Sequence, residues 1–277
     1  VVLFYALQQG ICHMVYWGHR GGKMFIIILL FGFLGLLLQR VSGTGFALVM
    51  VPVYTLFLGP VQGVMVSNIL NGLGCLLLML AVWRDLQWRR ILLISGFAVI
   101  GMVPGIFIIK LLSPGFLQLS IGLLMLFALA VSLRFNVDQP GREGLLPIAL
   151  CGLGGGFLVT TAGIPAPAMV IYARYINWPF RQFNAAMQGV FFIICLLTTF
   201  LKLNSGVPLP GEIFTLPHNV CFLFFALVGM ALGGYLSKII PVKYARASAF
   251  VVSVLGAAIA TGRGAWMLFA GGRIVQK

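Results

Sequence analysis

The sequence predicts an all-α polytopic membrane protein built from two inverted-topology repeats. Of its 277 residues, 61% are hydrophobic and only 8% are charged, and the mean hydropathy is +1.10. Several apolar stretches reach the length of about 18 residues or more that is typical of membrane-spanning helices. Two short polar breaks interrupt apolar segments at matching positions in the two halves. Each half is therefore expected to contain a broken or re-entrant helical unit followed by three transmembrane helices.

The remaining composition excludes several functional classes. The net charge of +14 comes from Lys and Arg spread over short loops, which indicates membrane topology and not nucleic-acid binding. The five cysteines are separated and form no CxxC pair, so we expect them to pack as small apolar residues. All four acidic residues lie in predicted loops, and the three histidines lie near segment ends or in loops. We therefore expect no catalytic residues, no metal site and no cofactor, and the chain is predicted not to be an enzyme.

The first repeat is expected at residues 24–135, after an N-terminal segment, 1–23, that the pattern does not place. Its broken unit has two apolar runs, Phe25–Leu38 and Phe46–Leu58, each shorter than the roughly 20 residues that cross a bilayer. The polar break between them contains Arg40. Pro60 is expected to begin the next helix, since proline is tolerated in a first helical turn. The three spans are predicted at 61–83, 91–111 and 116–133.

The second repeat, expected at 145–268, follows a polar linker at 136–144. It has an apolar run at 145–159, a break at 160–167 and a short run at 168–172. Pro179 opens the next helix at almost the same spacing from its break as Pro60 does in the first half. Its spans are predicted at 180–201, 220–236 and 247–267, with a loop over 202–219 and a C-terminal tail at 269–277.

The number of crossings in each half predicts the orientation. Three spans after a broken unit that contributes an even number of crossings make the count odd, so the halves must be inverted relative to each other. The loops that then face the cytoplasm carry more Lys and Arg, as the positive-inside rule requires. We expect a multi-pass protein of a bacterial inner membrane with a cytoplasmic linker and with both termini periplasmic.

The two breaks are the candidate substrate site. An arginine at the centre of a membrane helix costs about 2.5 to 3.5 kcal/mol, so Arg40 either faces a cavity or snorkels to the interface. No acidic residue lies within an apolar span, so an anionic ligand would supply the missing partner. Backbone N–H groups and hydroxyls at interrupted helices suit an anion. The predicted substrate-binding residues are Arg40, Ser42, Gly43, Thr44, Gly45, Asn68, Asn71, Thr160, Thr161, Gly163, Ile164, Pro165, Asn184 and Gln188.

Structural alternatives exist for these residues. Glycine clusters also permit close helix packing, and the Asn and Gln side chains could form interhelical hydrogen bonds without touching a ligand. The predicted site is asymmetric, with the fixed charge in the first half and backbone and hydroxyl donors in the second.

The pattern of glycine and proline residues along the chain resembles that of the TauE/SafE family of sulfite and sulfonate exporters. The resemblance rests on Gly43-Thr44-Gly45-Phe46 with Pro52 and Pro60 in the first half. In the second half it rests on Gly156-Phe157-Leu158, on Gly163 through Pro167 and on Arg181. It covers about 24–264 and departs from common family motifs at Ala47, Ala166 and Ala168. It implies export of small organosulfur anions such as sulfite or sulfoacetate.

The combined expectation is an alternating-access exporter that holds the anion between the two broken helices. Its expected partners are a small anionic substrate and the lipid bilayer, but no nucleic acid, and a homodimer stays open. The membrane potential favours anion exit by about 2.3 kcal/mol per charge per 100 mV, so efflux needs no coupled ion. Two alternatives stay open, namely uptake of another anion (sulfate, thiosulfate or a carboxylate) and a non-transporting membrane assembly subunit.

Overall fold

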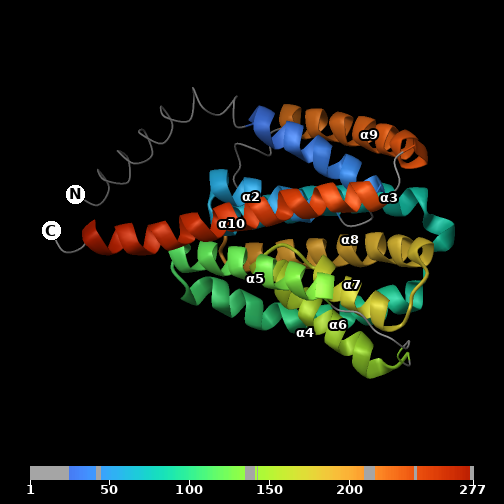
Figure 1. Ribbon diagram of the computed structural model, residues 1–277, viewed down its shortest axis with the longest axis horizontal. Coiled ribbons are helices and arrows are strands. Elements are labelled where there is room, and N and C mark those ends of the chain that lie inside the picture. Colours follow the sequence, from blue (N-terminus) through green and yellow to red (C-terminus); the bar gives the residue numbers. More distant parts are fainter. Residues whose placement is uncertain are drawn as a thin grey trace.

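The computed structural model is an all-helical bundle whose helices run roughly along one direction (Figure 1). The structure describes residues 25–41, 45–134, 141, 143–208, 216–239 and 242–274. The expected N-terminal segment, 1–23, and most of the linker at 136–144 lie outside these ranges. Five of the described helices are long and apolar enough to span a membrane: Pro60–Ala81, Trp88–Leu111, Pro114–Val131 within a longer helix, Phe180–Asn204 and Phe250–Phe269 within α10.

The first broken unit is a helical hairpin made of the Phe25–Val41 helix and α2 (Gly45–Leu58). The two helices are antiparallel, since the Tyr54 hydroxyl donates to the Ile28 carbonyl at 2.9 Å. Near the other end of the pair, a Cβ added at Gly35 would lie 2.9 Å from the ring of Phe46. This unit, the first hairpin below, therefore enters and leaves the bundle at the same end.

The second broken unit has the same form. It consists of α6 (Leu145–Thr161) and the short helix α7 (Ala166–Tyr175). Cys151 Sγ and Met169 Sδ are 3.1 Å apart, and the Gly141 amide donates to the Tyr175 carbonyl at 2.7 Å, which brings the end of α7 back beside the start of α6. The second hairpin, like the first, therefore enters and leaves the bundle at the same end.

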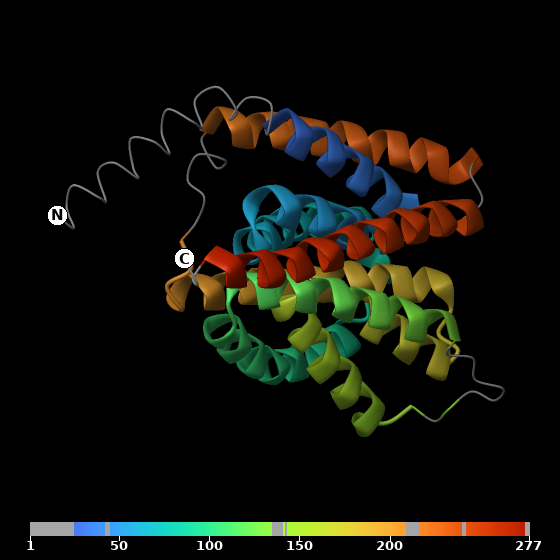
Figure 2. The same ribbon diagram turned by 60° about the vertical axis from the view of Figure 1, so that its left-hand side comes forward.

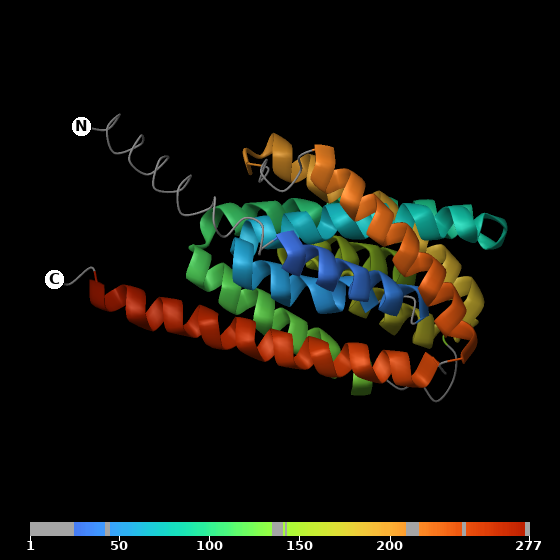
Figure 3. The same cartoon turned by 90° about the horizontal axis from the view of Figure 1, so that it is seen from above.

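The longer helices agree with the predicted spans, with differences at their ends. They are α3 (Pro60–Ala81), α4 (Trp88–Leu111), α5 (Pro114–Arg134), α8 (Phe180–Asn204), α9 (Leu216–Ile239) and α10 (Val242–Ile274). Prolines occupy the first position of α3 and α5, where no backbone donor is lost. α8 continues past Lys202 to Asn204, so the prediction that a loop begins at Lys202 is wrong. α10 extends beyond the neighbouring helices and past the expected boundary at 268 (Figure 3).

Glycines set the closest helix contacts. α4 and α6 run side by side, and a Cβ added at Gly152 would lie 2.6 Å from the Ile94 carbonyl oxygen. The Phe25–Val41 helix lies against α9 in the same way (Figure 2), and a Cβ added at Gly32 would lie 2.9 Å from the ring of Phe222. Small residues let membrane helices approach until their backbones are in contact.

One end of the bundle carries most of the described arginines and is called the arginine end below. Here Arg90 pairs with Glu143 and lies 4.7 Å from the centre of the Trp178 ring, while Arg181 pairs with Asp85 at 2.9 Å. The N-termini of α4, α6 and α8 therefore meet at this end. The first hairpin enters from the opposite end, where α3 begins, and the second hairpin enters from the arginine end.

Candidate functional site

The buried interface between α3 and α8 is the most polar part of the core. Asn71 Nδ2 on α3 lies 3.5 Å from Cys195 Sγ on α8. Further along α3, Cys75 shares a hydrogen-bond donor, Gln39, with Gln188, which comes earlier on α8, so the two helices are antiparallel. Each helix contributes a row of buried residues at alternating steps of four and three, the spacing that keeps one face of a helix against its neighbour. The rows are Val64, Asn68, Asn71, Cys75 and Leu78 on α3, and Gln188, Phe191, Cys195, Thr198 and Lys202 on α8. We call these two rows the polar interface.

The last turn of the first helix in the first hairpin reaches the polar interface near the arginine end. Gln39 is 1% exposed, and its Nε2 donates to Gln188 Oε1 and to Cys75 Sγ, both at 3.0 Å. Gln39 lies in the polar break that follows Leu38, but it is not among the predicted substrate-binding residues. The signal in the sequence is a glutamine in the last turn of an otherwise apolar helix.

Arg40 lies beside Gln39 and is partly exposed. It lines a small cavity together with Leu78, Asn184 and Gln188. The cavity has a volume of about 10 Å³, close to the minimum of about 10 to 15 Å³ for one water molecule, so the cavity itself is too small for an anion the size of sulfite. The arginine stem packs on α9, where a Cβ added at Gly233 would lie 2.9 Å from the Arg40 Cβ.

The rest of the first break is only partly visible. Ser42, Gly43 and Thr44, which the sequence predicted as substrate-binding residues, lie outside the described residues. Gly45 is the first residue of α2 and is buried. The structure therefore places Gln39 and Arg40 on one side of the break and Gly45 on the other.

The second break lies at the other end of the polar interface. Gly163 has φ of 71°, a left-handed conformation that favours glycine, and ends α6. A Cβ added there would lie 2.9 Å from Val51 Cγ2 and 3.2 Å from Val64 Cγ1. Asn68 joins α3 to the same region by donating from Nδ2 to the Val159 carbonyl at 3.2 Å. The tip of the second hairpin is thus packed against α2 and the first half of α3.

The donors predicted at this break are already in use. The amides of Gly163 and Ile164 donate to carbonyls of the last turn of α6 at 3.2 and 3.3 Å. The hydroxyls of Thr160 and Thr161 donate to the carbonyls four residues earlier, at 2.9 and 2.7 Å. Pro165 has no amide hydrogen to offer. In this closed arrangement the second break presents no spare donor among these four groups.

The two breaks are far apart along the polar interface. Arg40 lies near Leu78, whereas Gly163 lies near Val64, and these two α3 residues are separated by about 20 Å along the helix axis at roughly 1.5 Å per residue. Asn71 lies between them and accepts from Cys75 Sγ at 3.6 Å. The predicted residues therefore do not form one pocket. They are arranged along a buried row with one break at each end.

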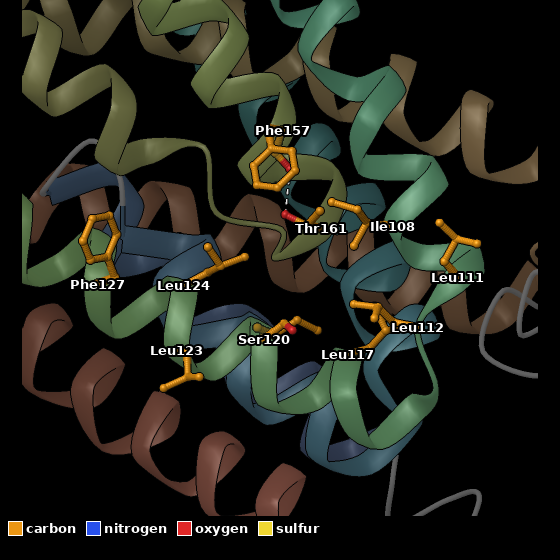
Figure 4. Close-up of a pocket in the computed structure, with 11 residues that line it drawn as sticks. Ile108, Leu111, Leu112, Leu117, Ser120, Leu123, Leu124, Phe127, Phe157 and Thr161 are labelled. Carbon is orange, nitrogen blue, oxygen red and sulfur yellow. Dashed lines mark hydrogen bonds between the residues drawn. The ribbon is translucent and has the colours of Figure 1, made fainter. Parts of the chain in front are cut away.

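A larger cavity opens near the second break, but its lining is apolar (Figure 4). It has a volume of about 580 Å³ and lies between α4, α5 and α6. Its polar side chains are Ser120 and Thr161, and the Thr161 hydroxyl donates to the Phe157 carbonyl. A cavity whose lining is almost entirely apolar and carries no charged side chain is a poor site for a small anion.

Comparison with known proteins decides the family. A family model described as sulfite exporter TauE/SafE matches residues 28–260, which is most of the chain. The chain belongs to the TauE/SafE family. TauE/SafE proteins are transporters, so this multi-pass membrane protein is a transporter and not an enzyme. No match was found among the curated proteins or among the solved structures.

Proposed function

We propose that this TauE/SafE protein exports small organosulfur anions, such as sulfite or a sulfonate, along the polar interface between α3 and α8. The observation that carries the proposal is the placement of the two hairpins. The hairpins enter from opposite ends of the bundle, and their breaks lie at opposite ends of the same buried polar row. Interrupted helices at matching positions in two halves are characteristic of substrate paths in secondary transporters.

The two hairpins would act as gates of an alternating-access cycle. The first closes the arginine end through Gln39 and Gln188, and the second closes the other end through Asn68 and the Val159 carbonyl. Gln188 and Asn68 both lie in the third turn of their helices, so each hairpin is held at an equivalent place. This equivalence supports two inverted repeats at 24–135 and 145–268.

The anion would move along groups that can donate hydrogen bonds. Arg40 and Asn184 line the small cavity at the arginine end, and Asn71 and Asn68 continue the row. Sulfite and sulfonate oxygens accept from guanidinium and amide groups, and such charge-assisted bonds are stronger than neutral ones. The closed cavity beside Arg40 corresponds to a state with no open entrance at that end.

The distribution of arginines supports a cytoplasmic location for the arginine end in a bacterial inner membrane. Arg84 and Arg89 are exposed there, beside the paired Arg90 and Arg181. Since α6 begins at this end, we propose that the linker at 136–144 is cytoplasmic.

Reconstituted transport tests the function. Proteoliposomes that contain the protein are loaded with radiolabelled sulfite, and efflux is compared with that of sulfoacetate, sulfate, thiosulfate and acetate. We expect Arg40→Gln to lower sulfite efflux about tenfold or more, since a hydrogen bond to a charged group contributes about 1.5 to 3 kcal/mol. Arg84→Gln is the matched control, because Arg84 is exposed at the same end, and its efflux should stay at the wild-type rate.

Two results would contradict the proposal. Equal efflux by Arg40→Gln and wild type would remove Arg40 from the path. Selective transport of a carboxylate or sulfate without sulfite or a sulfonate would replace the proposed substrate class.

A further inference from the structure

Lys202 is a buried lysine in the last described turn of α8, at the end of the polar interface opposite Arg40. Its side chain is 1% exposed and lines a closed pocket with Val64 and Thr161, beside the tip of the second hairpin. Its Nζ atom has no hydrogen-bond partner among the described residues. Burying an ammonium group without a partner is strongly unfavourable, so a bound anion would offset the cost of placing a lysine here.

The described surroundings of Lys202 contain no anionic partner. Asp85 and Glu143 are the acids that the structure describes, and both are paired with arginines at the other end of the bundle. The remaining pocket residues are apolar apart from Thr161, whose hydroxyl donates to its own helix. A site with a buried cation and no carboxylate can accept a small anion from the path.

Other unsatisfied polar atoms lie on the approach to Lys202. Thr198 is one turn earlier on the same face of α8, is fully buried, and its hydroxyl has no partner in the described structure. Asn68 uses its amide nitrogen for the Val159 carbonyl, while its Oδ1 has no partner. The hydroxyl of Thr198 can donate to an oxyanion that is bound at the ammonium group.

We propose that Lys202 forms a second anion-binding site of the transport path, with Thr198 as a hydrogen-bond donor. The site binds the oxyanion head group, a sulfite or a sulfonate, at the end that the second hairpin closes. This inference rests on the proposed function and extends it, because the path then carries a cation at each end, Arg40 and Lys202. An anion leaving one cation would be received by the other.

The second hairpin has space for the movement that would open this site. Thr161 lines the Lys202 pocket and also the apolar cavity of about 580 Å³ described above. Displacement of the hairpin tip toward that cavity would uncover the ammonium group without a rearrangement of α3 and α8.

Binding of sodium sulfite to the purified full-length protein in detergent tests the proposal, with methanesulfonate as a second probe. Isothermal titration gives the Kd, and the thermal unfolding temperature is measured with and without anion. We expect Lys202→Met to raise the Kd for sulfite about tenfold or more, the effect of one hydrogen bond to a charged group. Lys110→Met is the matched control, since Lys110 is exposed at the same end of the bundle and should leave the Kd unchanged.

The same measurements separate a binding role from a structural one. Removing an unpaired buried charge should leave the unfolding temperature without anion equal to or above that of wild type. Lys202→Gln, which keeps a polar side chain, provides a second variant. Sulfite should no longer raise its thermal unfolding temperature. Glu212→Gln examines the one nearby acid in sequence, which lies outside the described residues, and it should retain wild-type sulfite binding.

Three outcomes would overturn the proposal. Sulfite binding by Lys202→Met at the wild-type Kd would remove Lys202 from the site and leave the proposed function intact. A loss of stability shared by Lys202→Met and Glu212→Gln would identify a structural ion pair instead. Failure of wild type to bind either anion would refute both this inference and the proposed function.

Discussion

Gly163→Ala is the substitution whose effect can be worked out most fully from the structure. Gly163 has φ of 71°, and a residue with a Cβ pays about 1 to 2 kcal/mol in the left-handed region. The added methyl would also lie 2.9 Å from Val51 Cγ2 and 3.2 Å from Val64 Cγ1, so one of these side chains must move. Overpacking of this kind costs about 1 to 3 kcal/mol. We expect a total destabilisation of about 2 to 5 kcal/mol.

Gly206→Ala is the matched control for the backbone contribution. Gly206 has φ of 86°, and a Cβ there would have no described atom within 4 Å. Gly206→Ala should therefore lose only the backbone contribution of about 1 to 2 kcal/mol. The difference between the two variants isolates the contact of the hairpin tip with α2 and α3.

The assay is unfolding in mixed micelles by increasing SDS, followed by tryptophan fluorescence, with the free energy of unfolding taken from the transition. In a Val51→Ala background, Gly163→Ala should lower the free energy of unfolding by less than it does in wild type, because the closest contact of the added methyl group is then absent. Equal losses for Gly163→Ala and Gly206→Ala would refute the reasoning. If the free-energy losses of Gly163→Ala and Val51→Ala were simply additive in the double variant, the proposed contact with Val51 would be refuted.

Three further predictions concern the arginine end. Gln39→Leu removes the hydrogen bond from Gln39 Nε2 to Gln188 Oε1 and should lower the free energy of unfolding by about 0.6 to 1.7 kcal/mol in the same assay. An unchanged free energy would mean that this bond does not hold the first hairpin. Arg181→Ala should cost no more than about 1 kcal/mol, because the arginine side chain of its pair with Asp85 is 84% exposed. Arg90→Ala should cost more than Arg181→Ala, since Arg90 also lies over the Trp178 ring, and the reverse order in thermal unfolding would contradict this.

Much of the fold follows from the order of apolar and polar residues. The long spans, the two broken units and the helix start at Pro60 agree with the sequence, because length, hydropathy and proline act locally. Helix ends were less predictable. Lys202 reads as the start of a loop since a lysine commonly ends an apolar span, but the helix continues around it and buries it.

Composition, segment length and the family match, all properties of the sequence, identify a helical membrane protein of the TauE/SafE family with two matched breaks. The positions of those breaks relative to each other became clear from the folded chain. Because each hairpin enters from a different end, the breaks lie about 20 Å apart along α3 and not around one shared pocket. Contacts between residues distant in sequence, such as Gln39 with Gln188 and Asn68 with Val159, fix this arrangement. Local patterns carry no information about such pairings, and so the polar interface and its second cation became visible only in the folded chain.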